Sequence, residues 1–262
     1  MANMTSSVSA SQVAGELASA TFEEIPALVE HYREDPRQQV IKACERALKP
    51  HAKELAERER VNDMYELMHG LGGDGVVVGV DEVGRGSVAG PLTVCAVCLP
   101  MEPRVWGIND SKKLTPARRE LLSVKIAEVA TAIGFCHIAP KDIDEMGMAR
   151  AIRAAVVGAV ADTGLEPDCV LMDGNPLGAV PNERDVVKGD AKIACIAAAS
   201  IMAKVTRDEM MVEYDAEYPE YHLAESKGYA SPEHIEAIRK HGLCPLHRVS
   251  FCGNFLQTER LF

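Results

Sequence analysis

From position 76 onward, short apolar runs rich in β-forming residues alternate with longer stretches of helical periodicity. The expected strands are Val76–Val80, Pro91–Leu99, Ile133–Ile138, Cys169–Met172 and a short one at Val186-Val187. The expected helices are Ala117–Ala132, Lys141–Ala161, Ala191–Tyr214 and Pro232–His241. Thr115-Pro116 supplies a capping side chain and an N1 proline to the first of these helices. Adjoining strands followed by alternating helices and strands predict an α/β protein with a mixed sheet.

The first 75 residues follow a different pattern. Met1 to about Ala20 is rich in Ser and Ala and has no aromatic residue, which predicts a disordered or frayed tail. The next stretch, to about Gly70, has mixed charges and prolines at 26, 36 and 50, and it predicts several short helices such as Asp35–Leu48 and Lys53–Met68. The glycine-rich Leu71–Gly75 marks a boundary. We therefore expect a tail and helical extension over residues 1–75 and the main domain over residues 76–262.

Composition narrows the class of protein. With 262 residues, 47% of them hydrophobic, the chain can bury a real core. It has no run of about 18 apolar residues, so no membrane span is expected, and its start does not resemble a secretory signal. Eight cysteines, mostly in apolar runs, suggest reduced thiols in a cytosolic protein. Cys95 and Cys98 form a CxxC, but residues three apart in a strand point to opposite faces and cannot hold one metal together.

The charge balance argues at first sight against a nucleic-acid partner. The chain has 28 basic and 39 acidic residues, a formal net charge of −11. Neither part is basic, because residues 1–75 contain 8 basic and 13 acidic side chains and the remainder contains 20 and 26. Total charge is nevertheless a weak criterion, since affinity for nucleic acid depends on local phosphate contacts.

Acidic residues recur where apolar strands end. Asp81 and Glu82 follow Val76–Val80, Asp173 follows Cys169–Met172, and Asp190 follows the short strand at 186–187. Ligands of open α/β sheets gather beyond the carboxyl ends of strands. Converging carboxylates repel one another unless cations neutralise them, and Mg²⁺ and Mn²⁺ prefer such oxygen ligands. Two ions about 4 Å apart would form the clamp used in phosphodiester hydrolysis.

Each acid also has a structural alternative that spacing alone leaves open. Asp190 can cap a helix that begins at Ala191, and Asp173 can belong to a turn that ends at Pro176. Asp81 and Glu82, if both lie in one strand, point to opposite faces, so one of them can be solvated.

The amino-acid sequences of several segments resemble those of bacterial ribonuclease HII, the type 2 ribonuclease H family. The matching segments occur in the family's order across about Val76–Phe251. They are Gly79-Val80-Asp81-Glu82-Val83-Gly84-Arg85-Gly86-Ser87-Val88-Ala89-Gly90-Pro91, Asn109-Asp110-Ser111-Lys112-Lys113-Leu114, Met172-Asp173-Gly174-Asn175, Lys188-Gly189-Asp190, Ala197–Asp208, Lys227-Gly228-Tyr229 and His247-Arg248-Val249-Ser250-Phe251.

The resemblance implies an RNase H-like fold, with a five-stranded mixed sheet flanked by helices, a helical C-terminal part and a helical N-terminal extension. It implies endonucleolytic hydrolysis of the RNA strand of RNA–DNA hybrids and incision 5′ of single ribonucleotides embedded in duplex DNA. The products would end in 3′-hydroxyl and 5′-phosphate, and the enzyme would act as a cytoplasmic monomer, with a place in ribonucleotide excision repair.

The same resemblance assigns the chemistry to four acids. Asp81, Glu82, Asp173 and Asp190 would be catalytic and would hold two divalent ions, Mg²⁺ or Mn²⁺. Asp208 is the second choice for the fourth acid.

Recognition of the substrate would fall to a second group of residues. The backbone of Gly84-Arg85-Gly86 would approach the ribose closely and bond its 2′-hydroxyl, while the Arg85 side chain would hold a phosphate. Tyr229 would stack beside the ribonucleotide, or be an ordinary half-buried tyrosine. Lys112 and Lys113 would contact phosphates, or form a solvated pair. With Arg85, they would make a basic strip on an otherwise acidic body, and binding would be salt-sensitive.

Two further basic residues and the histidines have alternatives. Lys204 and Arg207 share one helix face, where they would contact phosphate or pair with acids that hold the site. His241 and His247 are expected to be structural, because no ligand spacing of a zinc site surrounds them.

Rival assignments explain fewer of these residues. Ribonuclease HIII has a similar acid set but normally a lysine where Arg85 stands, and a larger N-terminal domain. A binding protein with an inactive site would lack one of the acids. A phosphohydrolase of small molecules would not need Gly84-Arg85-Gly86 or Tyr229.

Overall fold

The computed structural model describes residues 8–256 and divides the chain into two compact units, Met1–Asn62 and Asp63–Phe262. The division falls inside one long helix, α3 (Gln38–Gly72). The functional division expected at residue 75 stays a prediction, because a division by contacts does not say which residues each activity needs. No helix of the described residues is long and apolar enough to cross a membrane.

The N-terminal unit contains α1 (Ala10–Ser19), α2 (Ile25–His31) and the first part of α3. The sequence predicted a disordered or frayed tail over about residues 1–20, and this is wrong where α1 forms. Residues 1–7 of that predicted tail lie outside the described part of the chain. Ser9 begins α1 with a capping box, in which the Ser9 hydroxyl accepts from the Gln12 N–H and the Gln12 side chain accepts from the Ser9 N–H. The helix then buries Val13 and Leu17 against α2 and α3.

Helix α3 replaces the two short helices expected there. Pro50 lies inside it. A proline removes one backbone hydrogen bond, but helix-forming residues continue on both sides, so the helix does not end. One face of α3, with Val40 and Cys44, packs in the core of the N-terminal unit.

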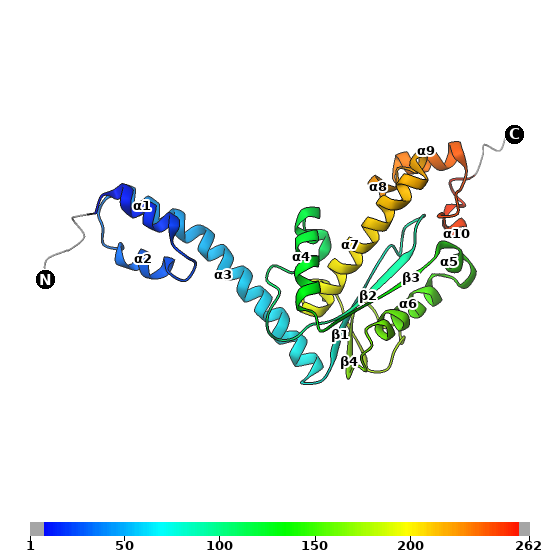
Figure 1. Cartoon of the computed structure of the whole chain (residues 1–262), viewed down its shortest axis with the longest axis horizontal. Coiled ribbons are helices and arrows are strands. Elements are labelled where there is room, and N and C mark those ends of the chain that lie inside the picture. The colour runs from blue at the N-terminus through cyan, green and yellow to red at the C-terminus, as the bar shows by residue number, and fades with distance from the viewer. Residues whose placement is uncertain (1–7, 257–262) are drawn as a thin grey trace. The chain divides into compact units, whose positions relative to one another are not determined.

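The second unit is built on a five-stranded mixed sheet in the order β3-β2-β1-β4-β5 (Figure 1). Strands β1, β2 and β3 are antiparallel neighbours, and β4 and β5 continue the sheet in parallel with β1. The bounds are β1 Val77–Val83, β2 Leu92–Cys98, β3 Ala132–Ile138, β4 Cys169–Asp173 and β5 Glu183–Val186. The α/β class and the RNase H-like sheet expected from the sequence are confirmed.

Helices cover the sheet and form the C-terminal part. Their bounds are α4 Pro116–Val129, α5 Pro140–Met146, α6 Met148–Asp162, α7 Ala194–Glu217, α8 Leu223–Ser226, α9 Pro232–His241 and α10 Val249–Cys252. The predicted cap of α4 is confirmed, since the Thr115 hydroxyl accepts from the Arg118 N–H. The single helix expected over Lys141–Ala161 is wrong, because Gly147, at φ +80°, ends α5 and begins α6.

Strand alternation decides what each helix covers. Val78 and Val80 of β1 share a core cluster with α6. Gly79 points the other way, and a Cβ there would lie 2.3 Å from the Cys195 carbonyl carbon of α7. The glycine therefore lets α7 lie close to β1. Asp81, two residues on, shares the face of Gly79 and so lies on the α7 side of the sheet.

Candidate active site

Asp81 and Glu82 are the last acids of β1, and both line a pocket of about 340 Å³. The same pocket is lined by Gly84-Arg85-Gly86, Lys112 and Tyr229, all predicted to bind the substrate. The lining also includes Val83, Lys204 and the pair Ser111 and Ser200, whose hydroxyl oxygens lie 2.9 Å apart. The structure therefore brings two of the predicted acids together with most of the predicted recognition residues.

Asp173 and Asp190 adjoin the pocket without lining it. Asp173 ends β4, and its Oδ1 accepts from the Gly189 N–H at 2.7 Å. Asp190 lies in a short 3-10 helix, Gly189–Ala191, and α7 begins only at Ala194. Asp190 is therefore not the N-cap of the long helix, which removes its structural alternative. Its Oδ2 lies 3.8 Å from the Lys112 Nζ.

Electrostatics couple the four acids. Burial, together with the charges of Glu82 and Asp173, raises the pKa of Asp81 to about 8. Burial also raises the pKa of Glu82, which nearby Arg85 partly offsets. Burial and then Asp173 raise the pKa of Asp190. The Asp173 carboxylate thus acts on all three other acids, so the four form one cluster of mutually repelling carboxylates.

The chemistry of this donor set fits a divalent cation. Four carboxylates would supply hard oxygen ligands, and a cation would offset both their mutual repulsion and the cost of burying their charges. In the described conformation, no three acidic, histidine or cysteine side chains converge on a point where an ion could be held. If the acid cluster holds an ion, closure around it would require side-chain movement.

The Arg207 side chain packs against the segment Gly84–Gly90 and hydrogen-bonds to it. This side chain is fully buried, and its Nε donates to the Pro91 carbonyl at 2.9 Å. Its other nitrogens donate to the Lys227 and Ala89 carbonyls and to the Ser87 hydroxyl. Neither expected role of Arg207 is seen, because the buried side chain contacts main-chain carbonyls and a hydroxyl and forms no ion pair with a described acid. Gly84, at φ +87°, leaves room for it, since a Cβ there would lie 2.4 Å from the Arg207 Nε.

A second fully buried arginine, Arg248, holds the same segment. It donates twice to the Gly90 carbonyl, at 3.1 and 2.9 Å, and once to the Arg85 carbonyl at 3.2 Å. Burial, and then the charge of Arg207, lower the pKa of Arg248 to about 10. Two arginines thus turn the carbonyls of this segment inward. The backbone N–H groups of Arg85 and Gly86 have no acceptor within residues 8–256, and both residues are exposed.

Gly86 differs from Gly84 in its surroundings. No described atom lies within 4 Å of where its Cβ would be. The fold itself therefore does not require a glycine at position 86, and the free space above it is open to a ligand.

Tyr229 lies on the other wall of the pocket. Its side chain is 40% exposed, and its ring centroid is 5.8 Å from the Arg207 Cζ. Gly228 before it accepts from the Val88 and Ala89 N–H groups, which fixes this segment against the one held by the arginines. The Tyr229 carbonyl accepts from the Nδ1 of buried His234, whose Nε2 is 3.1 Å from the His247 Nε2. His247 is therefore part of a buried network that supports the backbone of Tyr229.

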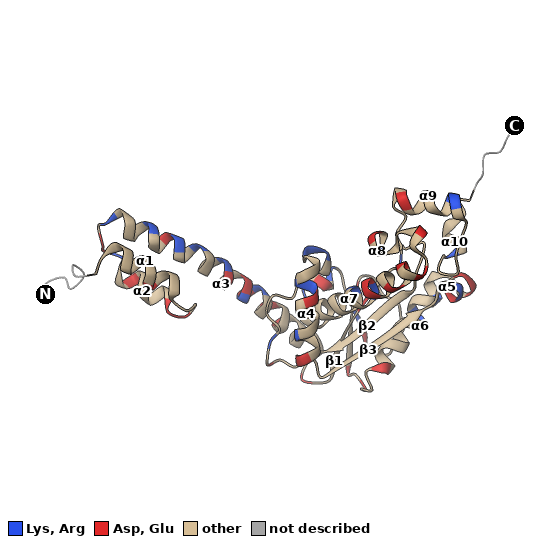
Figure 2. Cartoon of the chain, turned by 45° about the horizontal axis from the view of Figure 1, so that its top comes forward, with Lys and Arg blue, Asp and Glu red and all other residues tan. Residues whose placement is uncertain are grey.

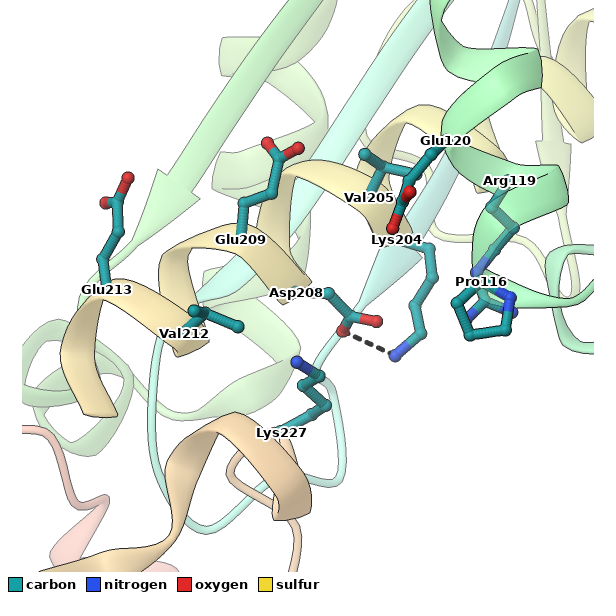
Figure 3. Close-up of a pocket in the computed structure, with 10 residues that line it drawn as sticks. All are labelled: Pro116, Arg119, Glu120, Lys204, Val205, Asp208, Glu209, Val212, Glu213 and Lys227. Atoms are coloured by element: carbon teal, nitrogen blue, oxygen red, sulfur yellow. Dashed lines mark hydrogen bonds and ion pairs between the residues drawn. The ribbon is translucent and has the colours of Figure 1, made fainter. Parts of the chain in front are cut away.

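Lys204 and Asp208 belong to a neighbouring hollow of about 560 Å³ between α4 and α7 (Figure 3). The Lys204 Nζ donates to Asp208 at 2.7 Å, so this lysine pairs with an acid as one alternative expected. Asp208 lines only the larger hollow, whereas Asp190 pairs with a lysine of the Asp81 pocket. The geometry favours Asp190 as the fourth acid. Lys113 is exposed and lines neither pocket, so its phosphate contact stays a prediction.

Sequence reasoning assigned no role to Arg248 or to the pair Ser111 and Ser200. In the sequence, Arg248 was noted only as part of the His247–Phe251 segment. A buried arginine that donates to carbonyls produces no hydrophobic or charge pattern that would identify it. The serines lie in two blocks 89 residues apart in the chain, and only the fold places their hydroxyls side by side.

Fold and site together define an α/β protein whose mixed sheet has an acid cluster at its edge, beside a glycine-rich segment and an exposed tyrosine. The family model described as Ribonuclease HII matches residues 78–254, and that of the Ribonuclease HII N-terminal domain matches residues 9–67. The chain belongs to the ribonuclease HII family. Its class of activity is accordingly that of a ribonuclease H, a nuclease and hydrolase.

Individual relatives agree with this assignment. The chain is 44% identical to a ribonuclease HII of Ruminiclostridium cellulolyticum, over 77% of this chain and 80% of the relative. It is 47% identical to one of Moorella thermoacetica, over 74% and 96%. Ribonuclease H2 of Pyrococcus horikoshii superposes with a TM-score of 0.59 at 27% identity, over 70% of this chain and 99% of that one. Bst-RNase HIII in complex with Mn²⁺ shares the fold, with a TM-score of 0.53, over 70% and 68% of the two chains at 18% identity.

Proposed function

We propose that this chain is a metal-dependent endonuclease that hydrolyses the RNA strand of RNA–DNA hybrids. It also incises 5′ of single ribonucleotides embedded in duplex DNA, leaving 3′-hydroxyl and 5′-phosphate ends. The observation that carries the proposal is that one pocket is lined both by Asp81 and Glu82 and by Gly84-Arg85-Gly86 and Tyr229. The acids that would support hydrolysis and the residues that would recognise ribose are thus close enough to contact one nucleotide.

The acids serve the chemical step. Asp81, Glu82, Asp173 and Asp190 would hold two divalent ions, Mg²⁺ or Mn²⁺. When bound, such ions activate a water and stabilise the leaving 3′-oxygen. The raised pKa values of Asp81, Glu82 and Asp190 support this role, because a bound cation would favour the ionised form that burial disfavours.

The glycine-rich segment serves recognition. The unpaired N–H groups of Arg85 and Gly86 would donate to the 2′-hydroxyl, which DNA lacks. Open space above Gly86 allows the sugar to come close to the backbone. The exposed Arg85 guanidinium would hold the neighbouring phosphate, and the Tyr229 ring would stack beside the ribonucleotide and favour an RNA-to-DNA junction.

Cellular context follows from the substrate. We expect the enzyme to act as a monomer in the cytoplasm and to begin the removal of ribonucleotides left in DNA.

Incubation with Mg²⁺ or Mn²⁺ and duplex DNA carrying one ribonucleotide tests the proposal. We expect incision 5′ of the ribonucleotide and no cleavage of the same duplex made only of DNA. Absence of incision with either ion would refute the assignment.

Asp173→Asn tests the role of the acid cluster. The variant should lose cleavage and retain hybrid binding, because the amide keeps the size of the side chain but not its charge. Asp208→Asn is the matched control, since it changes the same chemistry in the neighbouring hollow (Figure 3), and it should retain most activity. A fully active Asp173→Asn variant would remove Asp173 from the metal site.

A further inference from the structure

The N-terminal unit has a row of basic side chains whose role the active site does not explain. The row consists of Lys42, Arg46, Lys49 and Lys53, all exposed on α3, and is called the α3 basic row below. Figure 2 shows basic residues recurring along this helix. The spacings of four, three and four residues bring all four to one side of the helix, because residues three or four apart are neighbours on its surface.

This side is turned away from the core of the unit. Val40, Cys44 and Ala47 of α3 pack against α1 and α2. With 100° of rotation per residue, these core positions centre on one direction and the α3 basic row centres about 155° from it. The row is therefore an outer surface of the N-terminal unit.

The basic residues before position 76 divide into two sets of four. Four arginines form ion pairs within the N-terminal unit: Arg33 with Glu30, Arg37 with Asp35, Arg58 with Glu54, and Arg60 with Glu57. The four members of the α3 basic row form no ion pair or side-chain hydrogen bond with any of residues 8–256. In a unit with more acids than bases, unpaired cations are thus confined to one surface.

We propose that the α3 basic row binds the phosphate backbone of a nucleic-acid duplex. The proposal rests on the proposed function, since a phosphate backbone is then the polyanion present whenever the enzyme works. From Lys42 to Lys53 the helix rises about 16 Å, and one DNA strand places about five phosphates along that length. The four cations thus match the charge and the spacing of one strand, and they carry no base-specific chemistry.

The test measures the salt dependence of binding. The full-length quadruple variant K42Q/R46Q/K49Q/K53Q keeps residues of similar helix propensity and is compared with wild type. The probe is a fluorescently labelled DNA duplex carrying one ribonucleotide, in EDTA so that no cleavage occurs. Four lost phosphate contacts should reduce the slope of log K against log salt by up to about 3.6. Between roughly 50 and 200 mM salt, wild type would then lose up to about 150-fold more affinity than the variant.

Two control variants test whether the effect depends on charge and on position. The swapped variant K42R/R46K/K49R/K53R keeps the charges and should keep the wild-type slope. The variant K125Q/R150Q/R239Q/K240Q removes the same charge from exposed positions scattered over the second unit, and it should change the slope much less than the α3 variant. Circular dichroism of all variants should show the same helix content.

The outcomes separate this proposal from the proposed function. A wild-type slope in the α3 variant, or an equal reduction in the scattered control, would overturn the role of the row. If wild type fails to incise but the α3 variant still loses salt dependence, the proposed function fails and the binding surface stands. If wild type incises and the α3 variant binds with an unchanged slope, the proposed function stands and the role of the α3 basic row is refuted.

Discussion

Replacing Asp81 by Asn should stabilise the metal-free second unit while it abolishes cleavage. The Asp81 side chain is only 8% exposed, and its burial and the charges of Glu82 and Asp173 disfavour the ionised form. The Ser200 hydroxyl and the Glu82 N–H bond the carboxyl but offset only part of this effect. An amide in the same place would keep an acceptor for the Glu82 N–H without the charge.

The magnitude follows from the pKa of Asp81. Folding moves it from 3.8 to about 8. At pH 7 the folded protein must hold a proton that the unfolded chain has released, and each pH unit above 3.8 adds about 1.36 kcal/mol to that cost. The largest possible gain from Asp81→Asn at neutral pH is therefore about 4 kcal/mol.

The sign of the pH dependence is also determined. Because the folded-state pKa of Asp81 is raised, the folded protein binds more protons than the unfolded chain between pH 3.8 and about 8. The free energy of unfolding of the metal-free wild type then falls as pH rises through this window. In Asp81→Asn this contribution is gone, and the decline should be shallower.

Urea unfolding in EDTA, followed by tryptophan fluorescence, measures the effect. Trp106 is the one tryptophan of the sequence and lies in the second unit, so the signal reports that unit. Measurements at about pH 5 and about pH 7.5 give the slope, and Glu128→Gln, an exposed acid of α4, should change stability by less than about 0.5 kcal/mol. Added Mg²⁺ should stabilise wild type more than Asp81→Asn. A variant that is less stable than wild type at pH 7.5, with the same pH slope, would refute the reasoning.

Two further variants test the recognition side of the pocket. Arg248→Lys cannot make all three bonds to the Gly90 and Arg85 carbonyls, so we expect a loss of about 1–3 kcal/mol in urea unfolding and a raised KM for duplexes with one ribonucleotide; unchanged values of both would contradict the positioning role. Tyr229→Ala should reduce cleavage at single ribonucleotides more than cleavage of long hybrids, with Tyr229→Phe close to wild type because the ring remains. Equal losses on the two substrates would argue against junction reading.

Much of the fold could be predicted because its signals are local. The strand at Cys169, the cap at Thr115 and the helix Pro232–His241 each follow from a few neighbouring residues. The errors arose where tertiary contacts or one backbone angle decide. Helix α1 has only two buried apolar residues and is stabilised by packing in the N-terminal unit, and the break between α5 and α6 depends on the positive φ of Gly147.

The candidate site divides in the same way. The proximity of the four acids could be predicted, because acids that follow the carboxyl ends of neighbouring strands lie close together; their role in metal binding stays a prediction. The support beneath Gly84-Arg85-Gly86 could not be predicted, since Arg207 and Arg248 come from segments more than 100 residues away in the chain and bond main-chain atoms. Every sequence has the same main-chain carbonyls, so the residues of Gly84–Gly90 give no sign that two arginines bond them.

The charge of −11 shows why a total is a poor guide to partners. Acids and bases of the N-terminal unit are not mixed evenly: ion pairs neutralise four of its eight cations, and the other four share one outer surface. The electrostatic interaction between a phosphate and exposed charges of the protein is largely screened beyond about a Debye length, roughly 8 Å at physiological salt. Acids on the opposite side of α3 lie largely beyond that range. Binding would then follow the local surface, and the acidic remainder of the chain would chiefly limit attachment elsewhere.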